Sequence, residues 1–484
     1  MSLPVVAPRS RREAAVDDGM AAARAPANGV SPGLDHGALE DVFLVPHMDK
    51  YLLHAPLHGV TCLMSATTAA ELRRLLTGGD RRGVSPRAIR LVDDLRQRIA
   101  TVVPVRTGPF APRQVSLLPT NDCNMRCLYC APEAGSDDLS TMSEETCEAA
   151  LRYQADVVRR EDYRCLMVYY FGGEPFVAWR LVTFADTTAR RLADEIGRPM
   201  WSACTTNGFM SAMHASWVAR HLTFVLVSID GPAKVHDLYR PSRGGVGTHQ
   251  TVVRTLRIFE DQGLPYALRC SVDDRMVEHL AEIVDYLCRQ FRPVKINLEP
   301  LIMYGRCLET GLKSPTPAAF VNGIVAAGRV AREHGVDLKL TTAQTDRMAQ
   351  SYCAVAEDSF VVAPDGLVSA CFGANNRSSP HAQEYAIGEI DVGTGIVRID
   401  QARVDKVRGF AVANIPRCHD CFCKWHCSGG CRVFHTPPIS AEEPGPICMV
   451  TQKLTLWRIL QQLQLFDEAD RVRLEPEEVG DAFA

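Results

Sequence analysis

The stretch VSLLPTNDCNMRCLYC, residues 115 to 130, joins an apolar run to three closely spaced cysteines. The run VSLLP has the character of a buried strand. Cys123, Cys127 and Cys130 follow it in the pattern C-x3-C-x2-C. A structural zinc site usually requires four ligands, whereas a [4Fe–4S] cube held by three cysteines leaves one iron open to an outside ligand. The stretch therefore predicts a strand that leads into a cluster site with an open iron.

Five further β-rich runs follow, separated by amphipathic segments such as residues 143–161 and 277–291. The alternation of strand and helix predicts parallel βαβ units, and continuously apolar strands predict a sheet that is covered on its faces. The fold class is therefore α/β, either a doubly wound sheet or a partial (β/α)6 TIM-like barrel, which six strands favour. In both cases the chemistry belongs at the carboxyl ends of the strands. The runs are residues 166–173, 200–206, 223–229, 266–272 and 294–300.

Polar residues and glycines gather at these strand ends. Two glycines allow a backbone to approach a ligand closely, a carboxylate beside them can accept from an ammonium group, and an arginine can bind a carboxylate in bidentate fashion. Taken singly, such residues are ordinary strand-end turns or surface ion pairs. They are Gly172, Gly173 and Glu174 after the second strand, Asn207 after the third, Ser228 and Asp230 after the fourth, and Arg240 twelve residues after Ser228.

The motif CNMRCLYC, together with the Gly-Gly-Glu in YYFGGEP, resembles the radical S-adenosylmethionine (SAM) enzymes. The resemblance implies that SAM chelates the open iron of a catalytic cluster held by Cys123, Cys127 and Cys130. It further implies that SAM is cleaved reductively to a 5′-deoxyadenosyl radical. It places Glu174 by the SAM amino group, Ser228 and Arg240 by the ribose and carboxylate, Tyr129 by the adenine, and a backbone contact to the adenine within residues 297–301. Gly172, Gly173, Asn207 and Asp230 complete the expected cofactor site.

Eight cysteines lie beyond residue 350, and seven of them, all except Cys423, form a second field. Disulfides are not expected in a reducing cytosol, and structural zinc is the alternative to iron–sulfur clusters. The spacing resembles the SPASM domain of radical SAM enzymes that act on peptides, which implies two auxiliary [4Fe–4S] clusters. The expected ligands are Cys418, Cys421, Cys427 and Cys448 for the outer cluster, and Cys353, Cys371 and Cys431 for the inner one.

The inner cluster is one ligand short by this assignment. Arg347 stands where the similar but distinct anaerobic sulfatase-maturating enzymes have a further cysteine. The inner cluster therefore either keeps an open iron or recruits another group such as Cys423 or Cys307. Phe372 follows Cys371 where the sulfatase maturases have an aspartate base. This difference disfavours formylglycine formation.

The remaining segments divide the chain further. Residues 1–38 are expected to be a disordered leader, and 39–108 a small α+β winged-helix-like module whose order resembles peptide-recognition modules, or else an extension that only packs on the barrel. The expected barrel spans 109–335, the SPASM domain 336–455, and a covering helix and tail 456–484. His236 and His249 are expected to be solvated loop residues, with an approach to the site as the alternative.

The chain has 484 residues, a formal net charge of −4, 46% hydrophobic and 23% charged residues. This composition favours a cytoplasmic protein without a nucleic-acid or membrane partner.

The resemblance implies a maturase that abstracts hydrogen from a ribosomal (RiPP) precursor peptide and forms a cyclophane C–C or thioether crosslink. Its expected partners are the precursor peptide and a low-potential electron donor such as flavodoxin or ferredoxin. The alternatives are a radical oxidase or epimerase of a sugar or aminoglycoside, and a non-enzymatic iron–sulfur scaffold.

Overall fold

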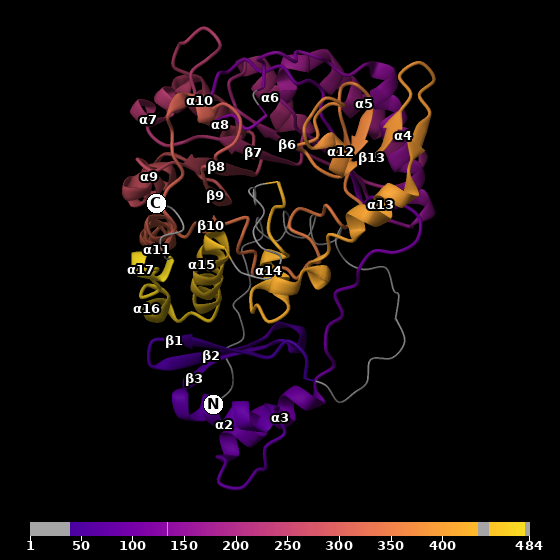
Figure 1. Cartoon of the computed structure of the whole chain (residues 1–484). Helices are drawn as coiled ribbons and strands as arrows, with labels where there is room; N and C mark the ends of the chain where they lie inside the picture. The colour runs from indigo at the N-terminus through magenta and orange to yellow at the C-terminus, as the bar shows by residue number, and fades with distance from the viewer. Residues whose placement is uncertain (1–38, 133, 434–444, 480–484) are drawn as a thin grey trace.

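Six consecutive parallel strands form the centre of the computed structural model, which describes residues 39–132, 134–433 and 445–479 (Figure 1). The expected leader, 1–38, lies outside the described residues. The strands lie side by side in chain order, as in a partial barrel, and each was predicted from the sequence. They are β4 (Gln114–Leu117), β5 (Leu166–Tyr170), β6 (Met200–Thr206), β7 (Phe224–Ser228), β8 (Tyr266–Val272) and β9 (Lys295–Pro300).

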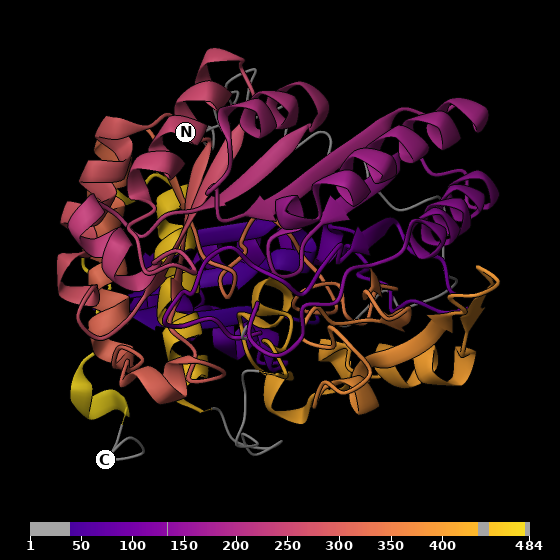
Figure 2. The same ribbon diagram turned by 90° about the horizontal axis from the view of Figure 1, so that it is seen from above.

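Helices cover the outer face of this sheet (Figure 2). Several begin at a side-chain cap; for example, Ser143 accepts a hydrogen bond from the backbone N–H of Thr146 at 3.1 Å, and Thr316 accepts one from Ala319. Such caps satisfy N–H groups that the helix itself leaves free. The covering elements are α4 (Glu144–Arg160), η2 (Pro175–Ala178), α5 (Trp179–Glu195), α6 (Ala212–His221), α7 (Ala233–Tyr239), α8 (His249–Asp261), η3 (Val277–His279), α9 (Leu280–Gln290) and α11 (Pro317–Glu333).

The inner face of the sheet is apolar at its base and polar toward the carboxyl ends of the strands. Met167, Trp201 and Phe224 form a small cluster at the base. One level higher, Ser228 of β7 pairs in register with Arg269 of β8, which pairs with Asn297 of β9. Because alternate residues of a strand share a face, these three side chains project side by side toward the barrel interior.

The sheet continues beyond the six predicted strands to eleven strands. β10 (Asp337–Lys339) pairs in parallel with β9, and β11 (Phe360–Val362) pairs in parallel with β4. From β11 the sheet turns antiparallel through β12 (Leu367–Ser369), β13 (Ala386–Ile390) and β14 (Val397–Ile399). The cysteine-rich C-terminal region is therefore joined to the barrel by a shared sheet.

The N-terminal elements form a separate antiparallel sheet of order β1-β2-β3 with two helices and their own apolar core. Three strands are followed by two helices in this part of the chain. The elements are β1 (Phe43–His47), β2 (Lys50–Ala55), η1 (Pro56–His58), β3 (Val60–Ser65), α2 (Ala66–Leu76) and α3 (Pro86–Gln97). In Figure 1 the module lies at one end of the molecule, next to α14, α15 and α16.

The rest of the C-terminal half consists of short helices and one long helix, α15 (Pro446–Gln462). α15 packs against α11 and begins at Pro446, ahead of the covering helix that was expected from residue 456. No helix among the described residues is long and apolar enough to cross a bilayer. The remaining elements are α10 (Cys307–Thr310), α12 (Ala382–Tyr385), α13 (Gln401–Arg408), η4 (Val412–Asn414), η5 (Pro416–Cys418), α14 (Lys424–Cys427), α15 (Pro446–Gln462), α16 (Phe466–Ala469) and α17 (Pro476–Val479).

Candidate functional site

The loop after β4 brings Cys123, Cys127 and Cys130 together at the carboxyl edge of the sheet. Burial raises the pKa of the Cys123 thiol, with smaller contributions from Glu174 and from the other two cysteines. Backbone N–H groups of Met125 and Ala134 each donate to a sulfur, of Cys123 and Cys130, at 3.4 Å. Buried sulfurs that already receive N–H donors, but are costly to ionise alone, suit a cationic iron centre that binds thiolates.

Two glycines hold this loop against the end of β5. A Cβ atom at Gly172 would lie 2.6 Å from the carbonyl oxygen of Thr120, and one at Gly173 would lie under 3.0 Å from that of Asp122. The backbone N–H of Gly173 donates to Thr120 at 2.9 Å. We expected these glycines to let the backbone approach a ligand; in the structure the close approach is to the cysteine loop itself.

Glu174 is buried and ties two strand ends together. Its carboxylate accepts hydrogen bonds from the hydroxyl of Thr206 at 2.8 Å and from the backbone N–H of Asn207 at 2.7 Å. Burial raises the pKa of Glu174 to about 7, against these bonds, which lower it. The side-chain amide of Asn207 in turn donates to Asn124 at 2.8 Å and to Cys123 Sγ at 3.6 Å. The Gly-Gly-Glu segment and Asn207 therefore lie at the cysteine loop, as the sequence placed them.

Arg240 lies beside Cys127 and is paired with Asp230. Its Nε donates to Asp230 at 2.8 Å, and its Nη1 donates to Cys127 Sγ at 3.8 Å. Both side chains are buried, and the Arg240 guanidinium lies 5.1 Å from the ring centre of Tyr129, whose hydroxyl also donates to Asp230. Within the described residues, Nη2 of Arg240 and the hydroxyl of Ser228 make no hydrogen bond. These two groups remain available to a ligand at the sheet edge.

The prediction that His236 is a solvated loop residue is wrong. His236 belongs to α7 and is fully buried, because α7 packs onto α8 and the strand end. Its Nδ1 accepts from the backbone N–H of Asp230 at 3.4 Å, and its Nε2 lies 3.1 Å from the Thr248 hydroxyl. His249 begins α8 and is half-buried, with Nε2 2.9 Å from the Tyr286 hydroxyl. His236 thus positions the backbone of Asp230, the partner of Arg240.

Three aromatic residues form a wall near the same edge. The ring centre of Phe372 lies 5.0 Å from that of Phe171 and 6.2 Å from that of Tyr169. Tyr169 belongs to β5, and Phe171 directly follows it. All three are only partly buried.

In the row of Ser228, Arg269 and Asn297, the Arg269 guanidinium makes no hydrogen bond or ion pair within the described structure, and the buried Oδ1 of Asn297 has no partner there either. Only the tertiary structure reveals this row, because its members lie on three strands.

The C-terminal cysteines have different thiol neighbours. Desolvation is the largest cause that raises the pKa of Cys353, and the neighbouring thiols of Cys371 and Cys431 raise it further. The pKa of Cys427 is likewise raised by desolvation and then by the thiols of Cys421, Cys448 and Cys418. Tyr352 lies within electrostatic reach of both groups. Desolvation and Glu299 are the largest causes that raise its pKa, and Cys431, Cys353 and Cys427 raise it further. In the described parts of the chain, no three His, Cys, Asp or Glu side chains are arranged to hold a single metal ion.

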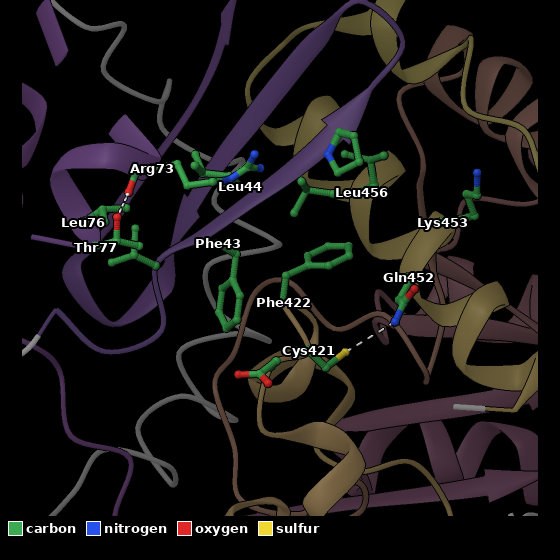
Figure 3. Close-up of a pocket in the computed structure, with 14 residues that line it drawn as sticks. Phe43, Leu44, Arg73, Leu76, Thr77, Cys421, Phe422, Gln452, Lys453 and Leu456 are labelled. Carbon is green, nitrogen blue, oxygen red and sulfur yellow. Dashed lines mark hydrogen bonds between the residues drawn. The ribbon is translucent and has the colours of Figure 1, made fainter. Parts of the chain in front are cut away.

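A groove of about 620 Å³ separates the N-terminal module from the outer cysteine group (Figure 3). Phe43 and Leu44 of β1 form one wall with Leu76 of α2, and Cys421 and Phe422 form the other. Gln452 of α15 donates to Cys421 Sγ at 3.7 Å at the base of this wall. The outer edge of β1 is unpaired within the described sheet, because the strand order is β1-β2-β3.

Comparison with known proteins agrees with this geometry. Residues 117–287 match the Radical SAM superfamily. The chain is 24% identical over 173 residues to the cysteine-type anaerobic sulfatase-maturating enzyme of Clostridium perfringens, covering 34% of this chain and 46% of that protein. The matched region thus spans about half the length of the curated relatives.

Solved structures extend the likeness to the fold of most of the chain. The structure of native anSMEcpe with bound AdoMet superimposes with a TM-score of 0.57 at 18% identity, covering 73% of this chain and 99% of the other. A structure of the same protein with AdoMet and the Cp18Cys peptide gives the same values. The chain therefore contains a radical SAM domain, a fold that binds SAM and a [4Fe–4S] cluster. Over that domain it is homologous to the anaerobic sulfatase-maturating enzymes.

Proposed function

We propose that this protein is a radical SAM maturase that crosslinks a ribosomally made precursor peptide. The observation that carries the proposal is the grouping of ten cysteines: three at the carboxyl edge of the sheet, three around Cys353 and four around Cys427. We assign one SAM-binding and two auxiliary [4Fe–4S] clusters to these groups. When bound, SAM and its cluster supply a carbon radical that removes hydrogen from the substrate.

In this proposal the edge residues orient SAM. The free Nη2 of Arg240 binds the SAM carboxylate, while Asp230 holds the guanidinium in place through Nε. The Ser228 hydroxyl binds the ribose, and the ring of Tyr129 lies by the adenine. Glu174 takes the SAM ammonium group; the pKa of this buried carboxyl, about 7, falls when a cation is bound beside it.

The barrel interior is suited to a peptide side chain. Tyr169, Phe171 and Phe372 provide an apolar wall, and Arg269 and Asn297 provide donors opposite an apolar base. Phe372 packs on the two barrel aromatics, so it supplies surface where the sulfatase maturases have a base. A substrate carbon that meets no base there is expected to form a bond within the peptide, a cyclophane or thioether link.

The groove beside β1 is suited to the precursor's recognition segment. An extended peptide can add to an unpaired strand edge through backbone hydrogen bonds while its side chains enter neighbouring pockets. The β1 edge has such a groove, lined by Phe43, Leu44 and Leu76. We expect the protein to act in the reducing cytoplasm, where its thiols stay reduced. A flavodoxin or ferredoxin would serve there as the low-potential electron donor.

Anaerobic reconstitution with iron, sulfide and SAM tests the proposal. We expect about twelve irons per chain, three four-iron cubes, and 5′-deoxyadenosine on addition of reductant. Incubation with a short precursor encoded beside the gene should then yield a peptide lighter by two hydrogen atoms. The Cys123/Cys127/Cys130→Ala variant should lose about four irons and all deoxyadenosine.

Other results would contradict specific parts of the proposal. A formylglycine product would show that the protein carries out the sulfatase-maturase reaction instead of crosslinking. Deoxyadenosine formation coupled to a sugar or aminoglycoside, and not to any peptide, would establish the small-molecule alternative. Intact clusters without SAM cleavage would indicate a scaffold.

A further inference from the structure

The inner cysteine group lacks a fourth ligand among its own sequence neighbours. Cys353, Cys371 and Cys431 form the group, and Arg347 occupies the position of the missing cysteine. The Arg347 guanidinium donates to the backbone carbonyl of Tyr352. A guanidinium stays protonated and has no lone pair for iron, so Arg347 cannot complete the site.

The two spare cysteines are placed elsewhere. Desolvation is the largest cause that raises the pKa of Cys423, and Cys421 and Cys427 raise it further. Cys423 therefore lies beside the outer group. The thiol of Cys307 donates to the carbonyls of Ile302 and Tyr304 at 3.2 and 3.1 Å, within its own loop. Neither thiol is directed to the inner group.

His381 lies near Cys371 of the inner group, across Gly373. The point where a Cβ would stand on Gly373 lies 3.3 Å from Cδ2 of His381 and 3.5 Å from Sγ of Cys371. Ser379 fixes this loop, donating from its hydroxyl to the carbonyl of Gly373 at 2.7 Å. A side chain at position 373 would fill the space between the His381 imidazole and the Cys371 sulfur, so glycine is needed there.

The ring nitrogen next to Cδ2 is unsatisfied. Nε2 of His381 is buried and makes no hydrogen bond to the described residues. A buried polar atom without a partner is costly and points to a group that the described residues do not supply. Tyr385, one turn along α12, lies within electrostatic reach of both Cys371 and Cys431, and its ring centre is 6.4 Å from that of His381.

We propose that Nε2 of His381 is the fourth ligand of the inner auxiliary cluster, which is then held by Cys353, Cys371, Cys431 and His381. The proposal rests on the inner cluster that the proposed function includes. Neutral imidazole is an established ligand of iron–sulfur clusters, and replacement of thiolate by histidine raises their reduction potential. An inner cluster of this kind accepts an electron more readily than an all-thiolate one, as a net oxidation of the substrate requires.

Pulsed EPR of the reduced full-length protein labelled with ¹⁵N-histidine tests the assignment. The Cys123/Cys127/Cys130→Ala background removes the SAM-binding cluster from the spectrum. We expect ¹⁵N hyperfine coupling on one auxiliary cluster, its loss in His381→Ala, and its persistence in the control His334→Ala, whose histidine pairs with Asp285 on a distant helix. In His381→Cys the coupling should disappear while the cluster remains, with its midpoint potential shifted downward.

The outcomes separate this proposal from the proposed function. About eight irons in the background variant, two cubes, without ¹⁵N coupling, or with coupling that survives in His381→Ala, overturn the His381 ligand and leave the maturase intact. Absence of auxiliary iron in a folded protein would overturn the cluster assignment on which both depend. Should His381→Ala lose iron through misfolding, His381→Cys decides by retaining the cluster without nitrogen coupling.

Discussion

His236 illustrates how a single residue controls the geometry of the candidate SAM site. Its Nδ1 accepts from the Asp230 backbone, and the Thr248 hydroxyl already donates to the carbonyl of Arg240 at 2.6 Å. The network therefore assigns the imidazole proton to Nε2. A second proton on Nδ1 would oppose the Asp230 N–H and break this contact.

Stability should consequently fall in acid. Burial lowers the pKa of His236 to about 4 from the ordinary 6.5; Arg240 and His249 also lower it, whereas Asp230 and Asp237 raise it. The unfolded chain takes up the proton below pH 6.5 and the folded chain only near pH 4. Stability from this residue is complete above pH 6.5, and about 3 kcal/mol is lost on acidification to pH 4. Denaturant unfolding of His236→Gln should show a correspondingly shallower pH dependence; parallel curves would contradict it.

Arg269 offers a second test at the residue scale. If its free guanidinium binds substrate, Arg269→Gln removes a charged hydrogen bond worth about 2 kcal/mol, or about thirtyfold in substrate-coupled turnover. Deoxyadenosine formation without substrate should change little, because Arg269 makes no hydrogen bond to the SAM-site residues. Exposed Arg275→Gln is the matched control. Equal loss of uncoupled SAM cleavage would instead place Arg269 in the cofactor site.

At the scale of elements, the site depends on how β5 meets the loop after β4. Main-chain atoms of residues 120–122 lie where side chains of Gly172 and Gly173 would stand. A second support comes from the segment after α7, where Arg126 and Leu128 donate backbone hydrogen bonds to Pro241 and Tyr239. The cysteine loop is therefore held both by the end of β5 and by the end of α7, which restricts a bound cluster to one geometry.

Gly173→Ala should displace this loop. The added Cβ would meet the backbone carbonyl of Asp122, which cannot rotate away as a side chain can. We expect loss of about four of twelve irons and of deoxyadenosine formation, with the auxiliary clusters retained. Gly244→Ala, where the nearest atom lies 3.9 Å away, is the control. Full iron and full activity in Gly173→Ala would show that the loop can relax.

At the scale of the whole molecule, the N-terminal module is docked by polar contacts to the C-terminal half. Glu468 of α16 pairs with Lys50 and lies 3.3 Å from His47. Trp425 of α14 donates from its indole to Asp41 at 2.7 Å, and His54 lies 3.1 Å from His426. These contacts form the groove by joining its two walls.

Glu468→Gln should loosen the module without touching a cluster. Loss of the Glu468–Lys50 ion pair should weaken the docking of the module and increase proteolysis within residues 98–106, where Ile99 is 90% exposed. Iron content should be unchanged. Glu477→Gln, a change at an exposed residue near the C-terminus, should behave as the parent. If cleavage rates are the same in both variants, the apolar contacts alone hold the module.

What the sequence determined by itself was local. Six strand runs, the helices between them and the spacing of the cysteines were readable because apolar periodicity, caps and short covalent spacing act over a few residues. The three-residue strands β10, β11, β12 and β14 were missed because so short a run has no periodicity of its own. Their strand geometry comes from neighbours far along the chain.

Only the tertiary structure decided which residues meet. It buried His236, paired Asp230 with Arg240, aligned Ser228, Arg269 and Asn297 across three strands, and set His381 beside Cys371. Each of these contacts depends on strand register or loop packing, and spacing along the chain carries no information about either. Sequence thus specified the type of chemistry, whereas folding specified the partners that tune it.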